Sequence, residues 1–222
     1  MELILHRFEL PLQHTFTISR GSVDVQETMI VELRHGGLAG FGEATTNSYY
    51  NATLEQMVAD LRRIEPLVAD STPEDPGQFW QQAREELADN PFAHCALDMA
   101  MHDLWGKVRG EPVYQLWGLS TDSVPASNYT IGIDSIDVMV EKMQQQAGWP
   151  IYKIKLGTPH DLEIIAALRE HTDAVFRVDA NCAWSVEETI ENSGAMRELG
   201  VEFIEQPLPA EQRDEMPHVK QH

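Results

Sequence analysis

Apolar and polar residues follow different patterns in the two halves of the chain. In the first half, extended segments rich in Leu, Ile, Val and Phe lie at 2–10, 25–34 and 38–44. Apolar residues at helical spacing then predict helices at 53–69, 76–88 and 92–109. Gly36 and Gly37 permit a tight turn, so the extended segments form a β-meander. The pattern predicts an α+β domain over residues 1–120.

After residue 120, strands and helices alternate strictly. Predicted strands lie at 128–133, 151–156, 175–179 and 201–205, and predicted helices at 135–147, 160–171 and 185–199. Parallel strands joined by helices account for this order, because each crossover needs a dozen or more residues. Residues 121–222 therefore form a second, α/β domain.

The polarity of these strands favours part of a (β/α) barrel over an open sheet. Lys153 and Lys155 share one strand face, and Arg177 and Asp179 share one face of the next strand. An open parallel sheet covered by helices on both sides is apolar on both faces. We therefore expect the first four or so βα units of a barrel, with charge at the carboxyl ends of its strands, where barrel active sites lie.

Those strand ends carry residues suited to proton transfer. Asp179 and Glu205 are hard oxygen ligands on successive strands and can converge on one Mg²⁺. Lys153 and Lys155 lie two residues apart, so that each disfavours the other's charge and one becomes available as a base near neutral pH. Each motif alone has a structural explanation, since Lys-x-Lys is most often a solvated strand face. Charged residues at the same end of successive strands together indicate a site for proton transfer.

The segments KIKLG, VDAN and EQPLP, preceded by ALDMAMHDLWGK at 96–107, resemble the muconate lactonizing branch of the enolase superfamily. This resemblance covers essentially the whole chain and implies an α+β capping domain over a (β/α)7β barrel that binds Mg²⁺. It implies that Lys155 is the acid/base lysine and Lys153 its electrostatic neighbour. The implied metal ligands are Asp179 and Glu205. Asn181 and Gln206 are the implied partners of those ligands.

Two further segments are similar to the dipeptide epimerases within that branch. NYTIGID carries Thr130, which matches a substrate-contacting threonine, and FTISRGS carries Arg20, which matches an arginine that pairs with a substrate glutamate. Phe16 and the loop at 45–51 are expected to close over the site. The implied reaction is inversion of a dipeptide α-carbon, of the L-Ala-D/L-Glu type, by lysine-mediated 1,1-proton transfer through a metal-stabilised enediolate.

The family pattern also requires a third carboxylate and an opposing lysine, and neither follows EQPLP before His222. We therefore expect this isomerase chain to be inactive alone and to be part of a longer chain, or to pair as half-barrels in a homo-oligomer. A cycloisomerase, an N-acylamino acid racemase or an o-succinylbenzoate-synthase-like enzyme remains an alternative. So does a non-catalytic, truncated remnant.

The composition of the chain limits the classes of molecule that it is expected to bind. The net charge of -20, from 36 acidic and 16 basic residues, disfavours nucleic acid, so a small-molecule substrate is expected. The chain has 2 cysteines without metal-binding spacing, which favours a cytoplasmic location, and no apolar run predicts a membrane span. His94, Asp98 and His102 share a helix face, but a metal site there is disfavoured.

Overall fold

The computed structural model describes residues 1–221 of the chain, which divides into two compact units. Unit 1 consists of Met1–Pro11 and Val25–Val124, and unit 2 of Leu12–Asp24 and Pro125–His222. The expected division into residues 1–120 and 121–222 is linear along the chain. In the structure, the segment from 12 to 24 groups with unit 2.

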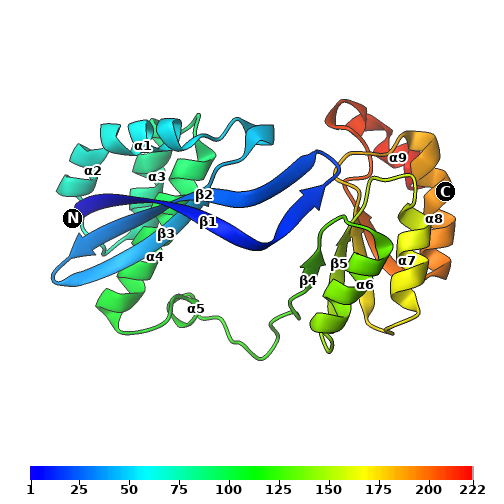
Figure 1. The fold of residues 1–222 in the computed structure, drawn as a ribbon. Helices are drawn as coiled ribbons and strands as arrows, with labels where there is room; N and C mark the ends of the chain where they lie inside the picture. The colour runs from blue at the N-terminus through cyan, green and yellow to red at the C-terminus, as the bar shows by residue number, and fades with distance from the viewer. Residues whose placement is uncertain (222) are drawn as a thin grey trace. The chain divides into compact units, whose positions relative to one another are not determined.

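Unit 1 is built on a sheet with the strand order β1-β2-β3 (Figure 1). The strands are β1 (Glu2–Ile18), β2 (Gly21–His35) and β3 (Leu38–Thr45), of which the first two extend into unit 2. The helices are η1 (Ser48–Tyr50), α1 (Leu54–Arg63), α2 (Glu65–Asp70), α3 (Pro76–Glu86), α4 (Pro91–Arg109) and α5 (Val113–Leu116). The predicted meander is present, but β1 and β2 are longer than expected.

Capping residues set the ends of the helices in unit 1. The side chains of Thr53, Asp75 and Asn90 each accept a hydrogen bond from a backbone N–H in the first turn of α1, α3 and α4. The single helix expected over 53–69 divides at Ile64, because Pro66 has no backbone N–H to continue the ladder. Helix α4 ends at Gly110, whose φ of 73° is left-handed.

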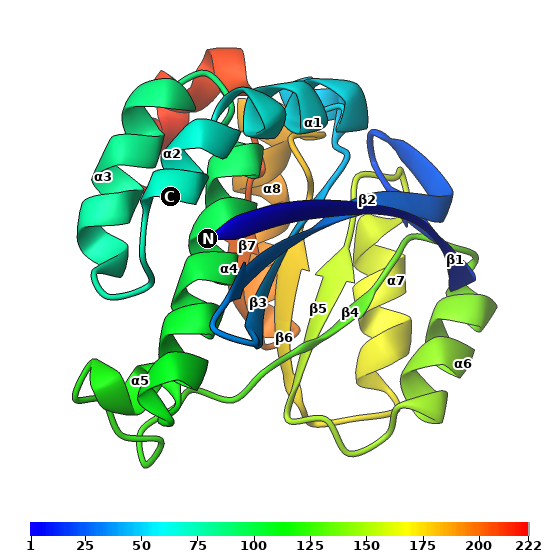
Figure 2. The same cartoon turned by 90° about the vertical axis from the view of Figure 1, so that its left-hand side faces the viewer.

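Helix α4 packs closely along β3 and forms the centre of the unit 1 core (Figure 2). Ala96, Ala100 and Leu104 of the helix are fully buried. Gly40 and Gly42 of β3 allow this approach, because a Cβ at Gly42 would overlap the carbonyl oxygen of Ala96. The small residues on both elements therefore fix the distance between helix and sheet.

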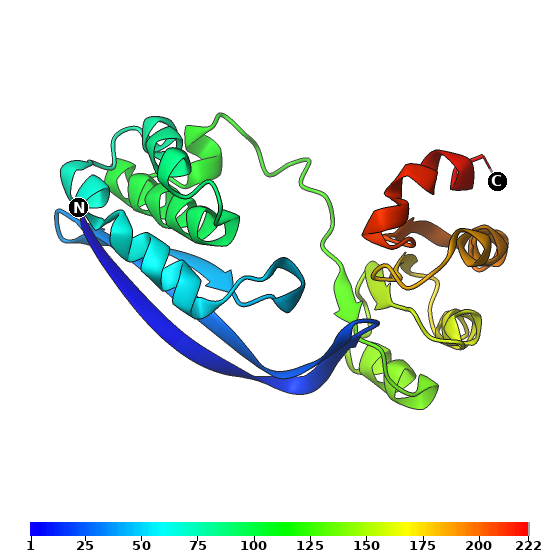
Figure 3. The ribbon, with the colours of Figure 1, turned by 90° about the horizontal axis from the view of Figure 1, so that it is seen from above.

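Unit 2 contains a parallel sheet in the order β4-β5-β6-β7. Its strands are β4 (Tyr129–Ile131), β5 (Ile151–Lys155), β6 (Val175–Asp179) and β7 (Val201–Glu205). Its helices are α6 (Ile136–Gln145), α7 (Asp161–Arg169), α8 (Val186–Glu198), η2 (Ala210–Glu215) and α9 (Met216–Val219). Figure 3 shows α6, α7 and α8 along one side of this sheet.

The two faces of the unit 2 sheet differ as the strand pattern predicts. Ile154, Phe176 and Val178 are fully buried in the core that includes residues of α6, α7 and α8. The opposite face carries the charged side chains and, on β7, Phe203, which is 45% exposed. Among the described residues, no helix combines the length and apolar character needed to span a membrane.

Candidate active site

The register of the parallel strands places three charged residues in one row. Lys155 of β5 is paired with Asp179 of β6, and Asp179 is paired with Glu205 of β7. Lys153 lies one step earlier on the same face of β5, in register with Thr130 of β4. The carboxyl ends of the strands therefore bring together the residues that the sequence singles out.

These side chains form a network of ion pairs around one carboxylate oxygen. Oδ2 of Asp179 lies 2.7 Å from Nζ of Lys155 and 3.2 Å from Nζ of Lys153. The ammonium group of Lys153 also lies 2.7 Å from Oε2 of Glu205. The side chains of Asp179 and Lys155 are only 2% and 11% exposed, so water screens this pair weakly.

The network shifts the pKa of two of its members. Burial alone would raise the pKa of Asp179, but hydrogen bonds from Lys155 and from the Asn181 N–H, together with the charge of Lys155, lower it below its usual value. Burial alone would lower the pKa of Lys153, but its hydrogen bonds to Glu205 and Asp179 raise it. Lys153 therefore keeps its charge, because two carboxylates contact its ammonium group, and the expected neutral base of the pair, Lys155, stays a prediction.

The loops that follow β6 and β7 have an unusual backbone. Asn181, Cys182 and Gln206 have φ angles of 48°, 66° and 43°, in the left-handed region that residues other than glycine rarely adopt. The N–H of Asn181 donates to Oδ1 of Asp179 at 2.9 Å, and that of Cys182 donates to the carbonyl of Gln206 at 2.7 Å. Such conformations concentrate at functional sites, where neighbouring contacts maintain them.

The tip of the β1–β2 hairpin lies in unit 2, against these loops. Ser19 Oγ and Arg20 Nη1 both donate to the backbone carbonyl of Asn181, at 2.9 and 2.7 Å. A Cβ added at Gly157 would lie 2.6 Å from Cβ of Ser19, so glycine makes room for the tip. Phe16, which is 36% exposed, lies near Gly132. The structure thus brings Arg20 and Phe16 to the strand ends.

The remaining predicted residues lie close to the same row. Asn181 is 4% exposed, and its Oδ1 is buried without a hydrogen-bond partner in the described part of the chain. Thr130 is half-buried, whereas the side chain of Gln206 is exposed and its backbone carbonyl makes the contact with Cys182. The structure therefore brings a backbone atom of Gln206 into the site.

The donor set fits a hard divalent cation in part. Asp179 and Glu205 already converge on one positive group, the ammonium of Lys153. The unpaired Oδ1 of Asn181 is a neutral oxygen two residues after Asp179. Within residues 1–221, no three His, Cys, Asp or Glu side chains come close enough to hold a metal. The structure thus supplies two carboxylates for such a cation.

The histidines of α4 make contacts within unit 1. His94 Nε2 lies 3.2 Å from the carbonyl of Trp80, and His102 Nδ1 lies 3.0 Å from that of Asp98. Both histidines thus contact backbone carbonyls of unit 1.

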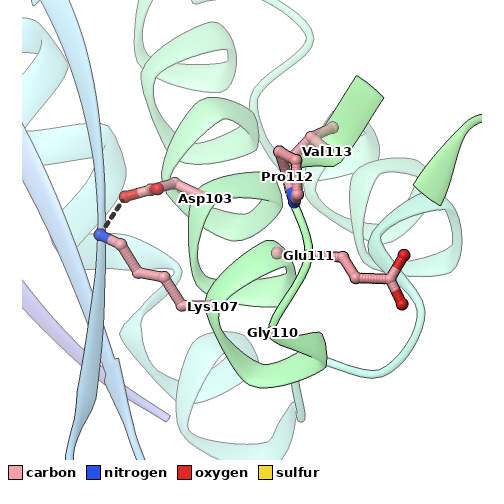
Figure 4. Close-up of a pocket in the computed structure, with 7 residues that line it drawn as sticks. Asp103, Lys107, Gly110, Glu111, Pro112 and Val113 are labelled. Atoms are coloured by element: carbon pink, nitrogen blue, oxygen red, sulfur yellow. Dashed lines mark hydrogen bonds and ion pairs between the residues drawn. The ribbon is translucent and has the colours of Figure 1, made fainter. Parts of the chain in front are cut away.

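A shallow pocket of about 290 Å³ lies at the end of the same helix (Figure 4). At its edge, Asp103 accepts hydrogen bonds from Lys107 and from the N–H of Phe41, at 2.7 and 2.8 Å. These bonds join α4 to β3.

Sequence reasoning missed Asp161 and Trp184. Asp161, only 4% exposed, accepts hydrogen bonds from the loop after β5 and from Nε1 of Trp184. Asp161 lies in the first turn of a helix, where acidic residues are common, so its sequence position alone does not indicate a special role. Trp184 was indistinguishable from a core tryptophan, because its long-range partner is twenty-three positions away.

Comparison with known families assigns both parts of the chain. The mandelate racemase/muconate lactonizing enzyme N-terminal domain matches residues 2–118, and the enolase C-terminal domain-like family matches residues 137–222. The chain belongs to the mandelate racemase/muconate lactonizing enzyme family. The predicted family is confirmed, and so is the fold of an α+β capping domain followed by part of a (β/α) barrel.

Two curated relatives are epimerases. The chain is 53% identical over 211 residues to an L-Ala-D/L-amino acid epimerase of Flavobacterium johnsoniae, covering 95% of this chain and 62% of the relative. It is 34% identical over 223 residues to an L-Ala-D/L-Glu epimerase of Bacteroides thetaiotaomicron, covering 100% and 58%. The chain therefore spans about three fifths of the length of these relatives.

A solved structure shows the same arrangement of elements. It is a dipeptide epimerase from Enterococcus faecalis, complexed with Mg and the dipeptide L-Leu-L-Tyr. The TM-score is 0.91 at 27% identity, and the match covers 99% of this chain and 64% of that one.

Proposed function

We propose that residues 1–222 carry the capping domain and the first barrel strands of a Mg²⁺-dependent epimerase that inverts the α-carbon of the second residue of a dipeptide. The observation that carries this proposal is the row of Lys155, Asp179 and Glu205 at successive strand ends, with Lys153 between the two carboxylates. The epimerase names of two relatives support it.

In this proposal Lys155 is the group that removes the α-proton. Its Nζ must leave Oδ2 of Asp179 and be neutral to accept a proton from carbon. Lys153 has a raised pKa and stays charged, so it provides a fixed positive group for the substrate carboxylate. Return of the proton to the opposite face requires a second acid, which we expect from a lysine on a later strand.

Asp179 and Glu205 would hold Mg²⁺ in this site. The cation would supply positive charge where negative charge develops as the α-proton leaves. Asn181 and Gln206 would support these ligands from the loops that follow the strands.

The substrate is proposed to be an L-Ala-D/L-amino acid dipeptide, with an acidic second residue as the finer assignment. Thr130 and Phe16 would contact the dipeptide, and Arg20 would pair with a side-chain carboxylate. Arg20 is an exposed residue, and its bond to the carbonyl of Asn181 keeps its guanidinium close to the strand ends. The cytoplasmic location and the homo-oligomeric state stay predictions.

The test measures exchange of the α-proton of L-Ala-L-Glu in D₂O by ¹H NMR, using the intact polypeptide that carries this sequence. Lys155→Met should lower the exchange rate by about 10³-fold, as expected for loss of a general base. Lys107→Met, in unit 1, is the matched control and should leave the rate unchanged. Unchanged exchange in Lys155→Met would refute the proposed role.

The acidic preference has its own test. Arg20→Ala should weaken use of L-Ala-L-Glu by about 2 kcal/mol relative to L-Ala-L-Val, if a desolvated charge pair is lost. An equal loss for both dipeptides would contradict the acidic assignment and leave the epimerase proposal intact.

A further inference from the structure

Asp161 connects two of the three loops that carry the candidate site and reaches the third through Trp184. It lies at the start of α7 and is 4% exposed, although it carries a carboxylate. Its oxygens accept hydrogen bonds from the N–H groups of Gly157 and Thr158, at 2.9 Å each, and from Thr158 Oγ1 at 2.8 Å. These donors belong to the loop after β5, and the first of them lies two residues after Lys155.

The same carboxylate reaches the loop after β6. Oδ2 of Asp161 accepts a hydrogen bond from Nε1 of Trp184 at 2.8 Å, and Trp184 is 4% exposed. Trp184 follows the left-handed residues Asn181 and Cys182 in the loop that orients Asp179. One buried side chain therefore joins the loop after Lys155 to the loop after Asp179.

Trp184 extends the connection to the loop after β7. Its backbone N–H donates to the carbonyl of Pro207 at 2.9 Å, two residues after Glu205. The N–H of Cys182 donates to Gln206 in parallel, at 2.7 Å. The series Asp161, Trp184 and Pro207 thus spans the loops that follow the strand ends carrying Lys155, Asp179 and Glu205.

We infer that Asp161 is a positioning residue for the site, and that it acts through Trp184. A buried carboxylate is costly unless donors surround it, and here every donor comes from a loop at the active end of the sheet. The benefit of keeping this charge buried is a fixed relative position of the three strand ends. The inference rests on the proposed function, because that proposal makes the strand ends an active site. The hydrogen bonds of Asp161 do not depend on any substrate.

The test compares two tryptophan variants of the intact polypeptide that carries this sequence, by native-state amide hydrogen exchange. Trp184→Phe removes the indole N–H that meets Asp161 while keeping an aromatic ring. Trp149→Phe makes the same chemical change at the other end of the sheet, where Trp149 packs against Tyr129. Loss of one buried hydrogen bond should reduce protection of the Cys182 and Trp184 amides about tenfold in Trp184→Phe.

The protection of the amides inside β6 shows whether a variant loosens only the loops or destabilises the whole unit. In Trp184→Phe, the β6 amides should keep their protection while the loop amides lose it, and Trp149→Phe should leave the loop amides unchanged. Asp161→Asn should give the same local pattern with a larger loss. Equal losses in the loop and in β6, or no loss in Trp184→Phe, would overturn the inference even if Asp161→Asn fails to fold.

A second readout follows Mn²⁺ binding by electron paramagnetic resonance. Trp184→Phe should weaken binding about tenfold relative to Trp149→Phe, as expected when support for a ligand is removed. Equal affinities for the two variants would contradict positioning of the metal ligands. If the unaltered chain binds no Mn²⁺, the proposed metal site fails, and the exchange data alone decide the role of Asp161.

Discussion

The two units use charge in different ways. In unit 1, the core is apolar packing of α4 on β3, and ion pairs such as Lys107 with Asp103 lie at its edges. The buried Glu32 pairs with His6 and Arg34 through separate oxygens. In unit 2, Lys153 and Lys155 share a single oxygen of Asp179 at the end of the sheet. Pairs on separate oxygens act one by one, whereas two lysines on one oxygen form a cluster in which each member depends on the others.

This difference has an electrostatic reason. The side chains of Lys107 and Asp103 are 41% and 38% exposed, so that solvent weakens their attraction. The Asp179 side chain is 2% exposed, and its charge is neutralised by the lysines and by backbone donors instead of by water. Disrupting the packing should therefore damage unit 1 most, and disrupting the charge should damage unit 2 most.

The largest expected effect comes from Gly42→Ala in unit 1. The new Cβ would overlap the carbonyl oxygen of Ala96, so that α4 must move away from β3, at a cost of about 3 kcal/mol in the free energy of unfolding. Urea unfolding followed by circular dichroism measures the loss. Gly194→Ala is the control, because a Cβ there meets open space on α8, and this change should stabilise the chain slightly. Equal stability of the two variants would show that the packing is not tight.

A smaller effect is expected from Asp179→Asn in unit 2. The two lysines would then face each other without the charge between them, and we expect a loss of about 2 kcal/mol in the free energy of unfolding. Asp103→Asn, which breaks an exposed pair, should cost less than about 1 kcal/mol. Thermal unfolding in metal-free buffer compares the two, and equal losses would contradict the distinction between shared and isolated pairs.

The sequence predicts which residues lie at the strand ends, because the alternation of apolar and charged residues within each strand determines the face on which each side chain lies. The apolar residues of each strand pack against the helices, so the alternate residues Lys153 and Lys155 must share the opposite face. By the same alternation, Asp179 and Glu205 lie on that face at the ends of their strands. Their convergence then follows from parallel register, which the structure shows. This part of the site needs no knowledge of distant contacts.

The sequence does not predict features that depend on distant contacts. The hairpin tip at Ser19 and Arg20 meets Asn181 across more than 160 residues. No periodic pattern encodes such a contact, and only the family resemblance predicts Arg20 at the site. The same reason hides the link from Asp161 to Trp184. The left-handed backbone of Cys182 is likewise maintained by its bond to Gln206, because a cysteine has no preference for that conformation.

The smallest expected effect concerns Glu32, a buried charge in unit 1 that sharpens the comparison. Its carboxylate accepts hydrogen bonds from His6 and Arg34, at 2.6 Å each, and these bonds lower its pKa below the ordinary value of 4.5. The unfolded chain therefore binds a proton more readily than the folded chain. The stabilisation by Glu32 is complete above the ordinary pKa and is lost as pH falls from there through the lowered pKa of the folded state.

Glu32→Gln should thus be less stable than the unaltered chain near neutral pH, by less than about 1 kcal/mol. The difference should shrink as the pH falls below the ordinary pKa of 4.5 and through the lowered pKa of the folded chain, since Glu32 then becomes protonated and uncharged, as glutamine is. Urea unfolding at a series of pH values measures this convergence. A difference that stays constant over the whole range would mean that the substituted amide is disfavoured for its shape and not for its missing charge. In that case unit 1 would depend on packing at this position as well, and the contrast with the charge cluster of unit 2 would become sharper.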